Sequence, residues 1–500
     1  MNLFSCVVCL LLIWLSTHYL LLLLKRTKYS QKQLPPGPFP LPVIGNVLNH
    51  IVNPQRSFGE IAKVYGPVMT VQLGYLTTVV ISSAAMARQV LQKQDLSFST
   101  RNPWAAVSVL DHHESSVAFL PPDSEWRNLR KICKSFIFSN SRIDASGALR
   151  RKVVQQLISH VQNRCAAGSA VNIREAAFTT SLNLISNTFF SSGLADYGGS
   201  ENQLKDLISA MVAEAGTLSG SDFFPMLKPF DPQGIRRRST IIMKKIFSIF
   251  NSIINERLTS RKASVSSEKN EDVLDSILNI SQGNNKEFDL SAIPHLLLDL
   301  FVAGTDTTST TFEWAMAELI KNPEKLEKSR AELERVIGTG NPIEEEDIAR
   351  LPYLQAVVKE TLRLHPAVAF LIPRKVAMDV HISGYTVPKG AQVLVNVWAM
   401  GREESVWEDA NSFMPERFLE SKIDVKGGDF ELIPFGAGRR ICPGMSLANR
   451  MVPYMLGSLI HSFNWKLGDG IKPENMNMDE KFGFTVTKAL PLHAIPFHSC

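Results

Sequence analysis

The sequence predicts a mainly α-helical protein with a small β portion, built as one large domain behind an N-terminal membrane segment. Three observations support this fold class. Most of the 500 residues follow helix-like patterns. Two short stretches alternate as β-hairpins do. The N-terminal stretch is almost wholly apolar, whereas the whole chain, at 45% hydrophobic and 20% charged residues, has ordinary globular composition.

The apolar stretch at residues 4–24 contains no Asp, Glu, Lys or Arg and is long enough to span a bilayer as a helix. Basic residues follow it at once and none precedes it, which places the N-terminus outside and the rest in the cytoplasm. A cleaved signal peptide is the alternative, but a basic leading region and a clear cleavage site are missing. We expect a membrane anchor at 1–24, a basic stop and proline-rich hinge at 25–45, and the catalytic domain at 46–500.

Two hairpins and several long helices are expected within the catalytic domain. Residues 68–81 alternate around Gly74-Tyr75, and residues 379–394 are expected to turn at Pro388-Lys389-Gly390. A long apolar helix is expected to begin near Ile293. The capping sequence Asn322-Pro323-Glu324 predicts the start of a further helix, which ends near Gly338.

Charge and cysteine content exclude several classes of protein. The net charge of +5 is mild, which argues against a nucleic-acid binder. The six cysteines are scattered and lack CxxC spacing, so a disulfide framework or a zinc site is not expected. This usage is typical of a reducing, cytosol-facing compartment.

The segment Pro434-Phe435-Gly436-Ala437-Gly438-Arg439-Arg440-Ile441-Cys442-Pro443-Gly444 carries the strongest chemical signal. Its glycines permit a tight turn and a close approach to a flat ligand. Cys442 precedes a helix expected from Met445, where free N–H groups and the helix dipole stabilise a thiolate. Arg440 is placed to pair with an anion. A thiolate ligand on haem iron favours O–O cleavage, whereas the plain alternative is a buried cysteine in a glycine-rich turn.

A second segment, Ala303-Gly304-Thr305-Asp306-Thr307-Thr308, lies inside the long apolar helix. Thr and Gly are poor helix formers, so their presence there indicates a local function. The Thr307 hydroxyl can bond the Ala303 carbonyl and bend the helix, opening a groove for O₂ and water. Asp306 and Thr307 would then deliver protons. A chance Thr-rich stretch is the alternative.

The cysteine segment resembles the haem-binding signature of the cytochromes P450, and the resemblance extends over nearly the whole chain. It implies the cytochrome P450 fold, preceded by one transmembrane helix, and a haem b whose iron is held by the Cys442 thiolate. The positions that match the family signature, and that would therefore bind the cofactor, are Phe435, Gly438, Arg440, Cys442 and Gly444.

The resemblance assigns further cofactor contacts. Trp126 and Arg130 are four residues apart, a spacing that in the family places both at the haem propionates, although an ordinary exposed helix start would look similar. Pro373-Arg374 resembles another propionate site. Ala303 would leave room against the ring.

A structural triad is also implied. Glu360 and Arg363 share one helix face and could be an ordinary surface pair. Family members join them to a second arginine that supports the cysteine loop, and Arg417 matches it. The histidines are expected to be structural or solvated and not to bind metal; they include His112, His113, His365 and His493.

Substrate contacts in this family come from segments between the motifs, and here these are apolar, which suits a lipophilic ligand. The sequence resembles a plant microsomal group with geraniol hydroxylases and ferruginol synthases, in motifs such as Phe230-Asp231-Pro232-Gln233-Gly234. This implies an abietane-type diterpenoid as first choice of substrate and a monoterpene alcohol as second. The segments are 104–119, 204–224, the helix face near Leu300 and Ala303, 367–372 and 482–486.

The expected function is that of a haem-thiolate monooxygenase that uses O₂ to hydroxylate a terpenoid, in a single oxidation or in successive ones. The chain has no dinucleotide-binding fingerprint, so electrons from NADPH would come from a separate NADPH–cytochrome P450 reductase in the same endoplasmic reticulum membrane. One rival is a haem-thiolate isomerase or dehydratase, against which Asp306 and Thr307 argue. The other is a non-catalytic haem- or lipid-binding protein.

Overall fold

The computed structural model describes residues 17, 34–48, 52–197, 202–263, 272–282, 289–468 and 470–498. The anchor expected at 1–24, apart from residue 17, and the basic stop lie outside this range. Across the described part of the chain, no helix combines the length and the apolar character needed to cross a bilayer. The proline-rich stretch from Leu34 forms neither helix nor strand before Leu41 bridges to Gly45, as fixed proline φ angles predict.

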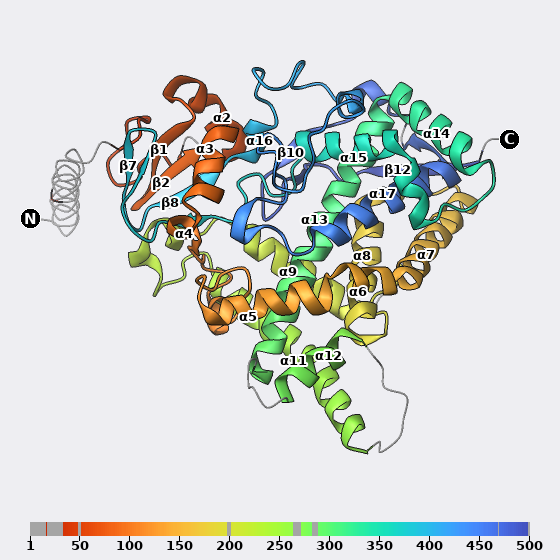
Figure 1. Ribbon diagram of the computed structural model, residues 1–500, viewed down its shortest axis with the longest axis horizontal. Helices are drawn as coiled ribbons and strands as arrows, with labels where there is room; N and C mark the ends of the chain where they lie inside the picture. The colour runs from red at the N-terminus through yellow and green to blue at the C-terminus, as the bar shows by residue number, and fades with distance from the viewer. Residues whose placement is uncertain are drawn as a thin grey trace, which may run out of the picture.

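Helices form most of the molecule, and the largest sheet lies toward one end (Figure 1). This confirms the predicted mainly α architecture with a small β portion. The helices of eight or more residues are α2 (Pro54–Tyr65), α5 (Ser124–Ile132), α7 (Gly147–Ala166), α8 (Ile173–Phe190), α9 (Gln203–Gly216), α11 (Ile235–Ala263), α12 (Val273–Gln282), α13 (Ile293–Lys321), α14 (Pro323–Ile337), α15 (Pro352–Leu364) and α17 (Met445–Ser462).

Helix α13 runs through the centre of the molecule (Figure 1). It begins at Ile293 with Pro294 in its first turn, as predicted, and packs against α8 and α17. Between Leu296 and Ile320 most of its side chains are buried. The stretch from Ala303 to Thr308 is more open, because several of its residues line a cavity. Helix α14 has the predicted bounds.

The five-stranded sheet has the order β1-β2-β8-β5-β3. Its first two strands form the predicted hairpin, turning at Gly74 and Tyr75. In its register Arg101 stands opposite Arg374, so the sheet edge places two arginines side by side. The strands are β1 (Val68–Leu73), β2 (Leu76–Ile81), β3 (Thr100–Arg101), β5 (Arg374–Lys375) and β8 (Gln392–Val395).

The second predicted hairpin exists, but its predicted turn is wrong. Strand β6 (Val380–Ile382) pairs with β7 (Tyr385–Val387) through a turn at Ser383 and Gly384, where both φ angles are positive, as tight hairpins require. Pro388 lacks an N–H group and ends the pairing, so the segment that follows leads into β8 of the other sheet. The remaining strands are β4 (Val171–Asn172), β9 (Asn464–Leu467), β10 (Glu480–Lys481), β11 (Thr487–Lys488) and β12 (His493–Phe497).

Candidate functional site

A cavity of about 600 Å³ lies at the centre of the site, with a mostly apolar lining. Each of the five segments predicted to contact substrate contributes residues to that lining. Cys442 and Thr307 also line it, so the two predicted chemical centres open into the same space. The cavity therefore joins the cysteine loop to the apolar segments.

The cysteine loop has a well-defined backbone. The amide of Cys442 donates to the Phe435 carbonyl at 3.0 Å. Helix α17 begins at Met445, so the sulfur lies at a helix N-terminus as predicted. Gly438 has a φ of +67°, and a Cβ there would lie 1.9 Å from the Leu91 carbonyl oxygen. Glycine is therefore required at this position.

The predicted thiolate stabilisation is present, but burial outweighs it. Burial raises the pKa of the Cys442 thiol, whereas the Gly444 amide, Arg130 and the Met445 amide lower it. The protein alone thus favours the neutral thiol. A metal cation at the sulfur would reverse this balance, because a coordinating thiol loses its proton.

Four guanidinium groups border the cavity and form no ion pair with any carboxylate of the described residues: Arg101, Arg130, Arg374 and Arg440. Three of them bond main-chain carbonyls instead. Arg374 donates to Phe98 at 3.1 Å and Arg440 to Ser99 at 3.0 Å, and Arg101 donates to the Ile372 carbonyl. The Nε groups of Arg101 and Arg374 are buried without a partner.

No carboxylate of the described residues balances the positive charge of these arginines, although a buried cation requires such a partner. Burial lowers the pKa of Arg374 to about 10. Burial, followed by the nearby Arg374 and Arg130, lowers the pKa of Arg440 to about 9. An anionic group in the cavity would offset this cost through charge-assisted hydrogen bonds. Together with a free thiol, the unpaired cations fit a haem, which carries iron and two propionates.

Trp126 lines the cavity but does not donate into it. Its indole N–H donates to the Val117 carbonyl at 3.1 Å, because a buried indole N–H requires an acceptor and this one is adjacent. The ring lies under the Arg440 guanidinium, 4.4 Å from its centroid. Trp126 therefore positions Arg440, and its own indole N–H is engaged by the Val117 carbonyl.

The predicted acid and alcohol on α13 point in different directions. Thr307 lines the cavity, and its hydroxyl donates to the Ala303 carbonyl at 2.7 Å, the bond expected from the sequence. Asp306 is fully buried, does not line the cavity, and accepts bonds from Arg174 and from the Thr485 hydroxyl. The structure thus does not bring the carboxylate to Thr307.

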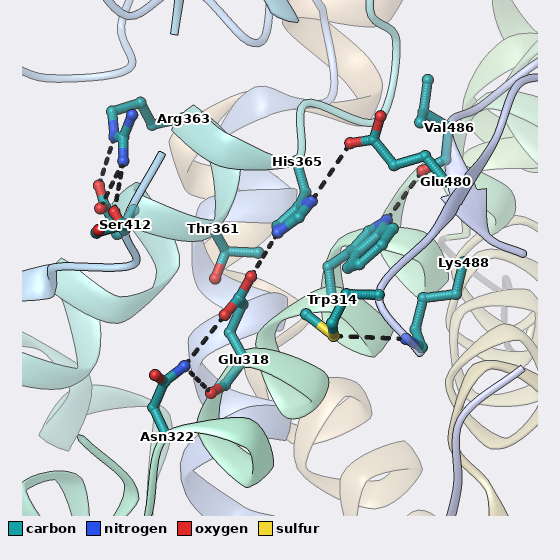
Figure 2. Close-up of polar contacts among 12 residues, drawn as sticks. Trp314, Glu318, Asn322, Thr361, Arg363, His365, Ser412, Glu480, Val486 and Lys488 are labelled. Atoms are coloured by element: carbon teal, nitrogen blue, oxygen red, sulfur yellow. Dashed lines mark hydrogen bonds and ion pairs between the residues drawn. The ribbon is translucent and has the colours of Figure 1, made fainter. Parts of the chain in front are cut away.

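The structural triad is assembled beside the cavity. Glu360 accepts two bonds from Arg363, both at 2.7 Å, and one from Arg417 at 3.1 Å. Arg363 also donates to the carbonyls of Ala410 and Ser412, in the segment that leads toward the cysteine loop. Figure 2 shows Arg363 turned toward this segment.

A second buried network joins α13 and α15 to the C-terminal segment that lines the cavity at residues 482–486. His365 lies between the carboxylates of Glu318, at 2.7 Å, and Glu480, at 3.7 Å, and stacks on Trp314 (Figure 2). The Trp314 indole donates to the carbonyl of Val486, which lines the cavity. His365 therefore has the structural role predicted for it, as does His112, which is buried against Asp299.

Sequence reasoning missed Arg101 and did not single out Asp222 within the predicted segment 204–224, and both residues line the cavity. Arg101 belongs to a two-residue strand, and Asp222 to the four-residue helix α10 (Gly220–Phe223). Elements this short have no periodicity, and only the fold places these residues beside the cavity.

Comparisons with known proteins agree with this geometry. A family model described as Cytochrome P450 matches residues 35–493. The chain is 54% identical to a geraniol 8-hydroxylase of Catharanthus roseus, over 93% of this chain and 94% of the other. It is 45% identical to a ferruginol synthase of Salvia miltiorrhiza over the same shares. A zebra fish cytochrome P450 structure with progesterone has a TM-score of 0.76 at 23% identity, covering 89% of this chain and 100% of that one.

Proposed function

This chain belongs to the cytochrome P450 family and is a P450 monooxygenase, and on that basis we propose that it hydroxylates a small lipophilic terpenoid. The observation that carries the proposal is the mostly apolar cavity into which Cys442 and Thr307 both open. Such a cavity binds an apolar ligand by burying its surface and orients it through a few polar groups.

The family binds haem through a cysteine thiolate, and the haem supplies the activation of O₂ with electrons received from a reductase. We assign the iron ligand to Cys442. Arg130, Arg374 and Arg440 would hold the propionates, together with Arg101, which stands opposite Arg374 in the sheet. Trp126 positions Arg440. Phe435, Gly438 and Gly444 would shape the cysteine loop around the haem. The small side chain of Ala303 would leave room for the haem ring beside α13.

Thr307 is proposed to hold a proton-donating water at the cavity. Its hydroxyl hydrogen is committed to the Ala303 carbonyl, so its oxygen is left to accept a hydrogen bond. Asp306 would transfer protons from the solvent toward Thr307. It is fully buried, but its partner Arg174 is 33% exposed, so the ion pair connects the interior to solvent. This role requires the carboxylate to turn from Arg174 toward Thr307.

Two substrate candidates follow from the relatives. A monoterpene alcohol is supported by the geraniol 8-hydroxylase at 54% identity, and an abietane diterpenoid by the ferruginol synthase at 45%. We further propose that residues 1–24 hold the enzyme in the endoplasmic reticulum membrane with its catalytic domain in the cytosol, beside an NADPH–cytochrome P450 reductase.

The direct test is turnover in microsomes that contain the full chain and the reductase. We expect NADPH-dependent hydroxylation of geraniol or of an abietane diterpene, measured by mass spectrometry. Product formed from a hydroperoxide without NADPH would indicate an isomerase or dehydratase instead. A ligand-induced spectral change without any product would indicate a non-catalytic binding protein.

A further inference from the structure

Two of the segments that line the cavity are joined to each other. Strands β10 and β11 pair as a hairpin whose tip, at residues 482–486, contributes to the cavity lining. The amide of Val486 in this tip donates to the carbonyl of Ala367 at 2.8 Å, and Ala367 begins the second lining segment, residues 367–372. We call these two segments together the hairpin wall.

The base of the hairpin is held by a buried carboxylate. The side chain of Glu480 is 5% exposed. It accepts hydrogen bonds from the Trp398 indole at 2.9 Å and from Gln55 at 3.1 Å, and it lies 3.6 Å from the Arg402 guanidinium. Burial alone would raise the pKa of this carboxyl, but the nearby His365, Arg402 and Trp398 lower it to about 2. The hairpin is therefore held by a charged group whose partners all lie outside it.

His365 connects this carboxylate to α13 and to the other half of the hairpin wall. Its Nε2 atom lies 2.7 Å from Glu318 of α13 and its Nδ1 atom 3.7 Å from Glu480, and its ring stacks on Trp314 (Figure 2). His365 stands two residues before the lining segment 367–372. Neither His365 nor Glu480 lines the cavity. The contact between them therefore sets the position of both halves of the hairpin wall from behind.

We infer that His365 and Glu480 are positioning residues that set the regioselectivity of the oxidation, although neither touches the substrate. This inference rests on the proposed function and adds to it how the oxidised carbon is chosen. The hairpin wall presents Phe370 and Phe482 to the cavity, with 5.9 Å between their ring centroids. Apolar contacts have no direction of their own, so a substrate packed on these rings follows the hairpin wall when it shifts.

The test measures the distribution of hydroxylated isomers from one substrate. The substrate is geraniol, or an abietane diterpene if the wild type does not oxidise geraniol. In geraniol, two methyl groups share one carbon and have nearly equal intrinsic reactivity, so the ratio of their hydroxylation reports the placement of the substrate. Isomers are separated and quantified by mass spectrometry after turnover in microsomes that contain the full-length, haem-loaded protein, NADPH and reductase.

Two variants alter the contact between His365 and Glu480. Glu480→Gln keeps the shape of the side chain and an acceptor for the Trp398 indole, but removes the charge that faces His365. His365→Phe keeps a flat ring against Trp314 and removes both nitrogen contacts. Glu474→Gln makes the same change at an exposed position of the same C-terminal region and is the matched control. Equal carbon-monoxide spectra in all variants verify an intact haem site.

We expect the ratio of major to minor isomer to fall about tenfold in Glu480→Gln and in His365→Phe, because a shift of roughly 1 Å at the reacting atom changes rates by up to about 100-fold. Glu474→Gln should keep the wild-type ratio. Val486→Ala alters the hairpin wall itself. If Glu480 acts through the hairpin wall, the effects of Glu480→Gln and Val486→Ala on the ratio should not be additive in the double variant.

Two results would overturn the inference. A wild-type isomer ratio in Glu480→Gln, even with a lowered melting temperature, would show that the carboxylate only stabilises the fold. Additive effects of Glu480→Gln and Val486→Ala would show that Glu480 does not act through the hairpin wall. In both cases the wild type still hydroxylates a terpenoid, so the proposed function stands. A wild type that oxidises neither substrate contradicts the proposed function, and the inference falls with it.

Discussion

Replacing Glu360 by Gln removes the single negative charge that two buried arginines share. Glu360 is fully buried, and its carboxylate accepts bonds from Arg363, Arg417 and the Met414 amide. Glutamine retains one acceptor oxygen and turns an N–H₂ group toward guanidinium donors. We expect this change to loosen the attachment of the segment from Met414 to Arg417 to α15. The cysteine loop, which this segment supports, should then be less stable.

The size of the effect follows from the burial of the pair. Arg363 and Glu360 are both 0% exposed, so neither solvent nor salt can replace the lost charge. Removing one partner of such a pair costs about 3–5 kcal/mol, a large share of the roughly 5–15 kcal/mol by which native proteins are stable. The apparent melting temperature should fall by about 5 °C, with earlier loss of haem.

The assay follows the carbon-monoxide difference spectrum during heating of wild type, Glu360→Gln and Glu334→Gln. Glu334 is exposed on α14, so its variant should remain within about 0.5 kcal/mol of the wild type. If Glu360→Gln were as heat-resistant as this control, the triad would not support the cysteine loop and the reasoning from buried charge would fail.

The remaining predictions concern proton delivery and pH. Thr307→Ala should keep substrate affinity but divert about tenfold more of the consumed NADPH from product to peroxide, because a cavity water loses its acceptor; unchanged coupling would exclude Thr307 from the relay. Folding raises the pKa of Asp222 from 3.8 to about 6, so stability should fall as pH rises through this window. This trend should be absent in Asp222→Asn when melting is measured from about pH 4 to about pH 7.

Much of this fold could be predicted because its signals are local. The Gly74-Tyr75 turn, the proline at the start of α13 and the bounds of α14 depend on neighbouring residues. The turn of the second hairpin was mispredicted because Pro388-Lys389-Gly390 also resembles a turn. Positive φ at Ser383 gave no sequence signal.

The site was predictable where a motif carries it and not where distant segments meet. The cysteine loop could be placed in detail, since Gly438 and the start of α17 follow from its own residues. The direction of the Asp306 carboxylate depends on Arg174 and Thr485, which are remote in sequence. The effect of burial on the Cys442 thiol likewise depends on the whole fold.

Everything proposed for this enzyme requires that Cys442 binds haem iron as a thiolate. The most direct measurement is the carbon-monoxide difference spectrum of the reduced protein in microsomes, beside Cys442→Ser. We predict a red-shifted Soret band in the wild type, as thiolate ligation produces, and its absence in the variant. A histidine-type band in folded, haem-loaded wild type, or the same red-shifted band in Cys442→Ser, would show that Cys442 is not the thiolate ligand.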